Sequence, residues 1–361
     1  MEATRRAFFA CFLIAAASGC SEENSPPEET VREPALPIPV AHETRYATVA
    51  IAEGKPRICG GTLGRIDRHI EAVANILDVE PEPIEIYWHE RSPNSGRAAA
   101  YFDHAAIVTF HQTLLHELVH AVSIPTLGRS DKMFIEGIAN AYEEGNTLLK
   151  SNEGFDVSAA LGLGSRGSGH FTRWLLETYG ADAFKALFDT PTPSTEEILE
   201  RMESAYGMTF DELEAEFFAT APAWYPEIGT CDGLDRYAWP EDSDRFRYEN
   251  VADCAAPNAF GHMGDEDEPY FMAFVLEVPP GLIGREFTAP IVLPDSTGNL
   301  GGLTPCSIGY GPPGDAEAET DIWQSAVSPF LVGEFRTTAY RVELPFLADG
   351  EPVGVEIQLR E

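Results

Sequence analysis

The chain is poor in basic residues. Only four of its 361 residues are lysine, and Lys and Arg together number 24 against 59 Asp and Glu, which gives a formal net charge of −35. A charge of this sign repels nucleic-acid phosphates and anionic lipid headgroups. The composition therefore argues against nucleic acid as a partner and against attachment to membranes through a basic surface.

Several common functional signatures are also missing. No run of 18 or more apolar residues occurs, so no segment is long enough to cross a bilayer as a helix. The Gly-x-Ser-x-Gly sequence of lipases, a P-loop, the EF-hand spacing and a Cys-x-x-Cys pair are absent. Hydrophobic residues at 44% and aromatic residues at 11% are nevertheless globular values, so the acidity does not indicate wholesale disorder.

The first residues predict a targeting signal. Two arginines precede an apolar stretch of eleven residues, Ala7 to Ala17, and small residues follow. These are the parts of a secretory signal. The ending Ala17-Ser18-Gly19-Cys20 resembles a bacterial lipobox, which implies a signal peptide at residues 1–19 and acylation of Cys20. The alternative is an ordinary signal cleaved near Ala17.

The lipobox resemblance carries expectations about location. It implies an exported lipoprotein of the bacterial cell envelope that touches the membrane through its N-terminal lipid anchor only. Ser rather than Asp follows Cys20, which resembles outer-membrane lipoproteins and favours that membrane. Residues 20–44 are rich in Glu, Pro and Ser, and we expect them to form a disordered tether after the acylated cysteine.

Two domains are expected after the tether, at residues 45–225 and 226–361. Helical periodicity fades near Ala221, and Pro, Gly and Asp become frequent beyond it. The fold class is therefore predicted to be α+β, with a β-rich, sandwich-like C-terminal domain. Apolar spacing predicts helices at 63–77, 112–123, 132–144, 170–179, 182–188, 195–206 and 210–220, with Pro125 ending the second. Alternation predicts strands at 46–52, 84–88, 105–110, 271–278, 286–293, 335–344 and 353–359.

Four cysteines remain outside the signal and the lipidation site: Cys59, Cys231, Cys254 and Cys306. An even number in an exported chain predicts two disulfides, for which three pairings are possible. The short loop that it closes favours Cys231–Cys254, which leaves Cys59 to pair with Cys306.

The strongest chemical signal is His116-Glu117-Leu118-Val119-His120, an HExxH sequence. Residues four apart share one face of a helix, so both imidazoles can reach one Zn²⁺. Glu117 can then reach water bound to that metal and act as a general base when the water attacks a carbonyl. A catalytic zinc takes three protein ligands, so a third ligand is expected elsewhere.

A candidate for that ligand lies sixteen residues after His120, in Phe134-Ile135-Glu136-Gly137-Ile138-Ala139. With this continuation the chain resembles the gluzincins, zinc peptidases whose third ligand is a Glu on a following helix, and most of all their peptidase-MA-like members. The resemblance covers residues 84–220 and implies a zincin-like domain in which Glu136 is the third ligand. Glu143 and Glu144 are the alternatives, with Glu136 as a helix N-terminal acid.

One position departs from the gluzincin pattern, and one role of that pattern has several candidate residues. In several gluzincins an Asp one turn after the ligand Glu orients the first His, and Asn140 stands there in this chain. An Asn carbonyl can accept from an imidazole N–H but brings no negative charge. Gluzincins also use a downstream His or Tyr to stabilise the oxyanion, and the candidates are His170, Tyr142, Tyr179 and Tyr206, with a plain helix-start role as the alternative for His170.

These features predict a zinc-dependent metallopeptidase that acts on a peptide or protein substrate at the cell envelope. The alternative is a non-catalytic surface lipoprotein with a structural or degenerate zinc site, whose β-domain binds a glycan or a protein. A zinc hydrolase that cleaves a non-peptide amide is a third possibility, which the sequence does not separate from the first.

Overall fold

A computed structural model describes residues 38–55, 57–88, 99–101, 106–109, 114–143, 166–189, 193–222, 225, 228–229, 231–261, 270–290, 303–306, 330–335 and 337–360. The predicted signal peptide, Cys20 and most of the predicted tether lie outside these residues. The described chain combines helices with several sheets, so the predicted α+β class is confirmed. None of its helices is both long enough and apolar enough to span a membrane.

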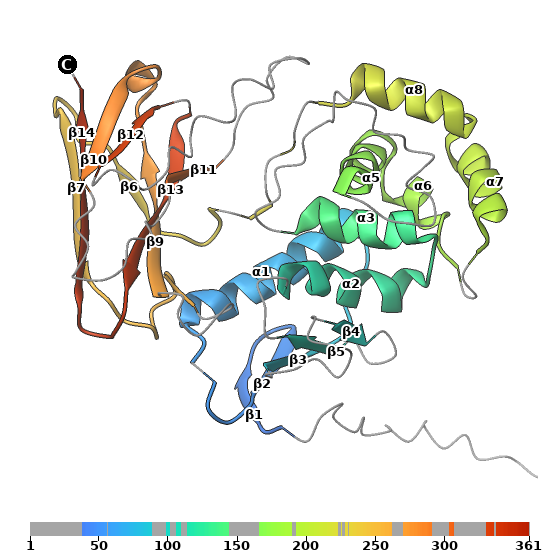
Figure 1. The fold of residues 1–361 in the computed structure, drawn as a ribbon, viewed down its shortest axis with the longest axis horizontal. Helices are drawn as coiled ribbons and strands as arrows, with labels where there is room; N and C mark the ends of the chain where they lie inside the picture. Colours follow the sequence, from blue (N-terminus) through green and yellow to red (C-terminus); the bar gives the residue numbers. More distant parts are fainter. Residues whose placement is uncertain are drawn as a thin grey trace, which may run out of the picture. The chain divides into compact units, whose positions relative to one another are not determined.

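The first half of the chain builds a five-stranded mixed sheet (Figure 1). Its order is β1 (Val40–Glu43), β2 (Ala47–Ile51), β3 (Ile84–Trp88), β5 (Ala106–Thr109) and β4 (Ala99–Tyr101). The three central strands are parallel, and the two outer strands run antiparallel to their neighbours. Strand β1 falls within residues 20–44, so the predicted tether is too long at its C-terminal end. Its pairing with β2 satisfies backbone groups that a free tether would leave to water.

The helices of this half are α1 (Gly60–Leu77), α2 (Leu114–Leu127), α3 (Lys132–Tyr142), α5 (Arg166–Tyr179), α6 (Ala181–Lys185), α7 (Thr195–Tyr206) and α8 (Phe210–Thr220). Figure 1 shows α1, α2 and α3 running beside one another, and α2 contacts α1, α3, β4 and β5. The boundaries of α7 and α8 agree with the prediction because both begin with a capping box, at Ser194 and at Thr209.

Pro125 does not end α2, contrary to the prediction. The helix continues through it to Leu127. The hydroxyl of Thr126 donates to the carbonyls of Val122 (2.7 Å) and Ser123 (3.1 Å), which supports the last turn although proline removes one backbone donor.

The described strands of the second half form two sheets. One has the order β12 (Phe330–Glu334), β10 (Glu286–Pro290), β14 (Pro352–Leu359) and β7 (Arg245–Val251). The other has the order β11 (Leu303–Pro305), β13 (Ala339–Phe346), β9 (Tyr270–Glu277) and β6 (Arg236–Ala238), with β8 (Ala259–Phe260) also paired to β9. Phe274 of β9 stacks on Tyr248 of β7 at 4.2 Å between ring centroids, so buried faces of the two sheets pack together.

The predicted strand 335–344 begins too early: β13 starts at Ala339, and β12 ends at Glu334, just before the predicted range. β12 pairs with β10 in one sheet, whereas β13 pairs with β9 and β11 in the other. The chain therefore crosses from one sheet to the other near Phe335, whose side chain is fully buried. Continuous apolar alternation hid this crossing, because residues on either side of it face the same core.

The buried apolar residues fall into separate clusters along the chain. The largest contains residues between Ala47 and Tyr225 and lies among the mixed sheet and the helices. Two others contain residues from Cys231 to Ile357, together with Cys59. Cys59, which directly precedes α1, is thus the one described residue of the first half whose side chain joins a cluster of the second.

The two predicted disulfides are present, but the favoured pairing was wrong. The bonds join Cys59 to Cys254 and Cys231 to Cys306. The physical reason is that the start of α1 lies against residues 254–261. Backbone N–H groups of Cys59 and Gly60 donate to the carbonyls of Gly261 and Cys254, both at 2.8 Å.

Two glycines permit this close approach. A Cβ at Gly60 would lie 2.7 Å from the Ala255 carbonyl oxygen, and one at Gly61 would lie 2.5 Å from the Ala259 carbonyl oxygen. Any other residue would push the backbones apart, because these contacts are shorter than real Cβ contacts. The Gly60-Gly61 pair is therefore required by a tertiary contact.

Candidate metal centre

Helix α2 carries the two histidines of the HExxH sequence on one face. Leu118, Val119 and Val122 are fully buried and hold the helix between its neighbours. His120 is 5% exposed, and His116 is more accessible, with 16% of its side chain exposed. The four-residue spacing thus places both imidazoles at the helix surface that faces α3, as expected from helix geometry.

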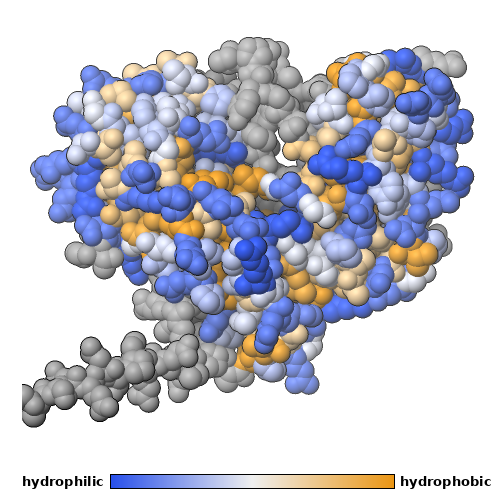
Figure 2. All heavy atoms as spheres, turned by 180° about the vertical axis from the view of Figure 1, so that it is seen from behind, coloured by the Kyte–Doolittle hydropathy of each residue, from blue (hydrophilic) through white to orange (hydrophobic). Residues whose placement is uncertain are grey.

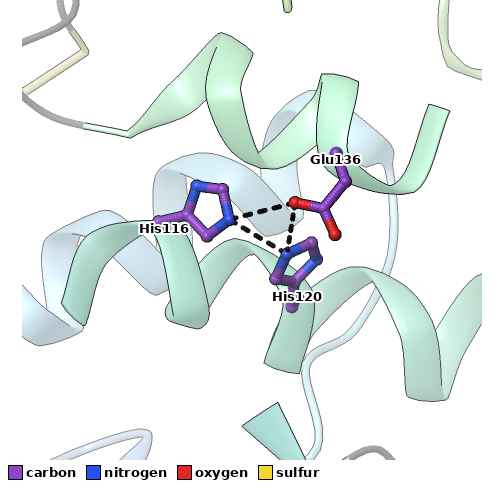
Figure 3. Close-up of side chains that lie close together, drawn as sticks. All are labelled: His116, His120 and Glu136. Carbon is purple, nitrogen blue, oxygen red and sulfur yellow. Dashed lines mark hydrogen bonds and ion pairs between the residues drawn. The ribbon is translucent and has the colours of Figure 1, made fainter. Parts of the chain in front are cut away.

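Three donor atoms converge at this surface (Figure 3). The Nε2 atoms of His116 and His120 lie 3.1 Å apart. The Oε2 atom of Glu136, on α3, lies 3.5 Å from Nε2 of His116 and 3.8 Å from Nε2 of His120. Figure 3 shows the Glu136 carboxylate directed at both rings. The structure therefore brings together the three residues that the sequence nominated.

These distances suit a shared zinc ion. Atoms that lie 2.0–2.1 Å from one zinc at tetrahedral angles are about 3.3–3.4 Å from one another. The three observed separations, 3.1, 3.5 and 3.8 Å, surround this value. Two imidazole nitrogens and one carboxylate oxygen are also donors that zinc commonly takes. The cluster fits the ion in both geometry and chemistry.

Local sequence explains how α3 presents Glu136. Asp131 caps the helix by accepting a hydrogen bond from the Met133 N–H at 2.9 Å. Phe134 and Ile138 are fully buried and fix the rotation of the helix. A Cβ at Gly137 would collide with the hydroxyl of Thr172 on α5. The glycine after Glu136 is thus needed for close packing of α3 on α5.

The cluster distributes its protons unevenly. Burial lowers the pKa of His116, but its side-chain contacts with Glu136 and Glu143 outweigh this and raise the pKa to about 9. Burial and the neighbouring His116 lower the pKa of His120 to about 4. The contact with His116 holds the pKa of Glu136 below its usual value, against the effect of burial. Without a metal ion, His116 therefore carries a second ring proton and a positive charge at neutral pH. A metal ion that binds at Nε2 would have to displace the proton there.

The residue that contacts the far side of the His116 ring is Glu143. Its Oε2 lies 2.8 Å from Nδ1 of His116. The sequence nominated Asn140 for this role, and the structure corrects the position. Glu143 follows Glu136 by seven residues, so two helical turns return it to the same face of α3, next to α2. The seven-residue spacing from Glu136 to Glu143 could have indicated this contact, but the family pattern pointed to Asn140, one turn earlier.

Glu117, the candidate base, is 9% exposed and follows His116 on α2. His170, a candidate for stabilising the oxyanion, packs among other residues. Its Nε2 lies 2.9 Å from the carbonyl of Pro222, and its ring packs edge-on against Phe217 and Tyr225. These contacts explain His170 as a packing residue.

The three candidate tyrosines also have neighbours outside the metal cluster. Tyr142 lies beneath the guanidinium of Arg173, 5.3 Å from the ring centroid. Tyr179 and Tyr206 pack edge-on against each other at 5.0 Å. Burial raises the pKa of Tyr179 to about 12 and raises that of the other two further. These tyrosines therefore stay neutral at physiological pH.

His69 on α1 makes stability depend on pH. Its Nε2 lies 3.2 Å from the carbonyl of Leu115, the residue before His116. Burial, with the charge of Arg65, lowers its pKa from 6.5 to about 4. The imidazole of His69 therefore binds a proton more readily in the unfolded chain than in the folded one. Its contribution to the stability of the fold is complete above pH 6.5 and is lost as pH falls toward 4. We expect His69→Gln to remove on the order of 2 kcal/mol of the acid-induced destabilisation between pH 7 and pH 5.

The measurement is the free energy of unfolding from urea titrations of both metal-free proteins at several pH values. The difference between the two proteins isolates His69 from the other histidines. Curves that stay parallel from pH 7 to pH 5 would contradict the assignment.

No protein-family model matches the chain, and a search of the curated proteins gives no significant match.

Proposed function

We propose that the protein is a zinc-dependent metallopeptidase of the gluzincin type, with a zincin-like domain formed by the mixed sheet and its helices. One observation carries this proposal: the convergence of His116 Nε2, His120 Nε2 and Glu136 Oε2, with Glu117 directly after His116 on α2. Each of these residues has the role in the HExxH…E pattern that the sequence assigned to it.

The chemistry divides among a few groups. Zinc would act as a Lewis acid that polarises the carbonyl of the scissile amide. Glu117 would take a proton from the attacking water and pass it to the leaving amine.

The sheet offers a place for an extended substrate. β4 stands last in the described strand order, is paired on one side with β5, and contacts α2. Among the described residues no strand pairs with its other edge, to which a peptide could add as a further strand. A substrate bound in this way would pass close to the helix that carries Glu117, which supports a peptide as substrate.

Two features favour a catalytic over a structural zinc. Structural sites are usually closed by four protein ligands, whereas the cluster among the described residues has three. About a third of the Glu136 side chain is exposed, 34%, so solvent reaches the cluster. An accessible three-ligand site leaves one position for water or substrate.

The proposed location rests on the sequence alone. A lipid on Cys20 would anchor the chain at the bacterial cell envelope, with the outer membrane favoured. The substrate would then be a peptide or protein of the envelope or its surroundings.

The test begins with the chain from Ser21 onward. We expect one zinc per chain by elemental analysis and cleavage in a peptide library that a chelator abolishes and added zinc restores. One zinc without cleavage of any peptide would contradict the peptidase and favour a non-catalytic zinc module. A chain without zinc would contradict both.

A further inference from the structure

We propose that Glu143 is a positioning residue for the proposed metal centre: it fixes the ring of His116 and strengthens that ligand. This inference rests on the proposed zinc site and deepens it. The gluzincin pattern places such a carboxylate one turn after the ligand Glu, where this chain has Asn140. The structure instead assigns the role to the end of α3.

The two nitrogens of the His116 ring have different neighbours. Nδ1 faces Oε2 of Glu143 at 2.8 Å, while Nε2 faces Glu136 and His120. A neutral imidazole carries a proton on one nitrogen and a lone pair on the other. A carboxylate at Nδ1 holds the proton there, so the lone pair at Nε2 points toward the metal position.

Glu143 itself is not a ligand in this arrangement. Its carboxylate contacts the nitrogen opposite the one that joins the cluster, and the cluster consists of His116, His120 and Glu136. The alternative in which Glu143 replaces Glu136 as third ligand therefore has no support from the geometry.

Burial makes the contact effective. The side chains of Glu143 and His116 are only 15% and 16% exposed. A charge-assisted hydrogen bond shielded from water is stronger than the same pair on the surface. The carboxylate also raises the basicity of the imidazole, which an amide at Asn140 would do more weakly.

The place of Glu143 on its helix also needs an explanation. It is the C-terminal capping residue of α3, and its backbone N–H donates to the Ala139 carbonyl at 2.8 Å. A negative charge near a helix C-terminus is disfavoured by the helix dipole. The contact with His116 is the interaction that compensates for this placement.

The test is zinc affinity, measured by competition with a chromophoric chelator. Glu143→Gln keeps an acceptor for Nδ1 but removes the charge, and Glu143→Ala removes both. We expect zinc binding to weaken by about 10-fold in the first and by up to about 100-fold in the second. Glu203→Gln, which removes an equal charge from an exposed position on α7, should bind zinc within about 2-fold of the parent.

The outcomes separate this inference from the proposed function. If Glu143→Gln and Glu143→Ala both bind zinc as tightly as the parent, the positioning role is overturned while the peptidase proposal stands. If the parent binds zinc but cleaves nothing, the graded loss of affinity still supports the positioning role. A parent that binds no zinc overturns both. Should Glu143→Ala fail to unfold cooperatively, the nearly isosteric Glu143→Gln decides alone.

Discussion

Replacing Glu117 by glutamine is expected to leave one zinc per chain and to lower the rate of peptide hydrolysis by at least about 100-fold, and by up to about 10,000-fold. Glutamine has nearly the same size and polarity as glutamate, so α2 should keep its packing. It cannot take a proton at neutral pH. The loss would therefore fall on the chemical step rather than on folding or metal binding.

The measurement is kcat and KM on the best peptide from the library, with zinc content determined on the same samples. We expect kcat to fall and KM to change little, because an interaction made only during proton transfer is lost. Glu196→Gln, at an exposed position in the first turn of α7, is the matched control and should retain the parent rate. Full activity in Glu117→Gln would sink the general-base assignment.

Replacing Glu136 by alanine is expected to empty the metal centre. Two histidines alone hold zinc weakly, so zinc content should fall from about one per chain to near zero after dialysis against a weak chelator. The Glu136 side chain is 34% exposed and Phe134 and Ile138 keep their burial, so the fold should survive. Retention of zinc would show that another residue is the third ligand.

A matched control lies on the same helix. Lys132→Ala changes an exposed position one turn before Glu136 and should keep its zinc. Circular dichroism of both variants separates loss of metal from loss of structure. Hydrolysis should disappear in Glu136→Ala and persist in Lys132→Ala.

The same experiments bear on the choice between peptides and other amides. A zinc ion with a general base would hydrolyse a cell-wall crosslink by the same steps as a peptide bond. The edge strand β4 favours an extended main chain, because a strand that is paired on one side only among the described residues can take an extended peptide as its next neighbour. Cleavage of short extended peptides, with no activity on isolated crosslinks, is therefore the expected pattern.

Local patterns succeeded where one short stretch of chain determines the outcome. The His116–His120 spacing places two imidazoles on one helix face in any helix, and the capping boxes at Ser194 and Thr209 define where α7 and α8 begin. The α+β class follows in the same way from apolar periodicity. The identity of Glu136 came from a family resemblance, and the geometry of the cluster agrees with it.

Other features depended on contacts between distant segments. The disulfide partner of Cys59 is 195 residues away and is set by the approach of α1 to residues 254–261, where two glycines allow the backbones to touch. The strand expected at 335–344 begins only at Ala339, because the chain changes sheets between β12 and β13, which periodicity does not register.

The identity of the residue beside His116 Nδ1 also depended on tertiary contacts. Both Asn140 and Glu143 follow Glu136 on one face of α3, and only the packing of α3 on α2 decides which of them meets the ring. By itself the sequence determined the fold class, because helix periodicity is local, and it nominated His116, His120 and Glu136 as metal ligands and Glu117 as the base from ligand chemistry and a family resemblance. Tertiary structure alone decided the cysteine pairing and the partner of His116, because these depend on how close separate backbones approach.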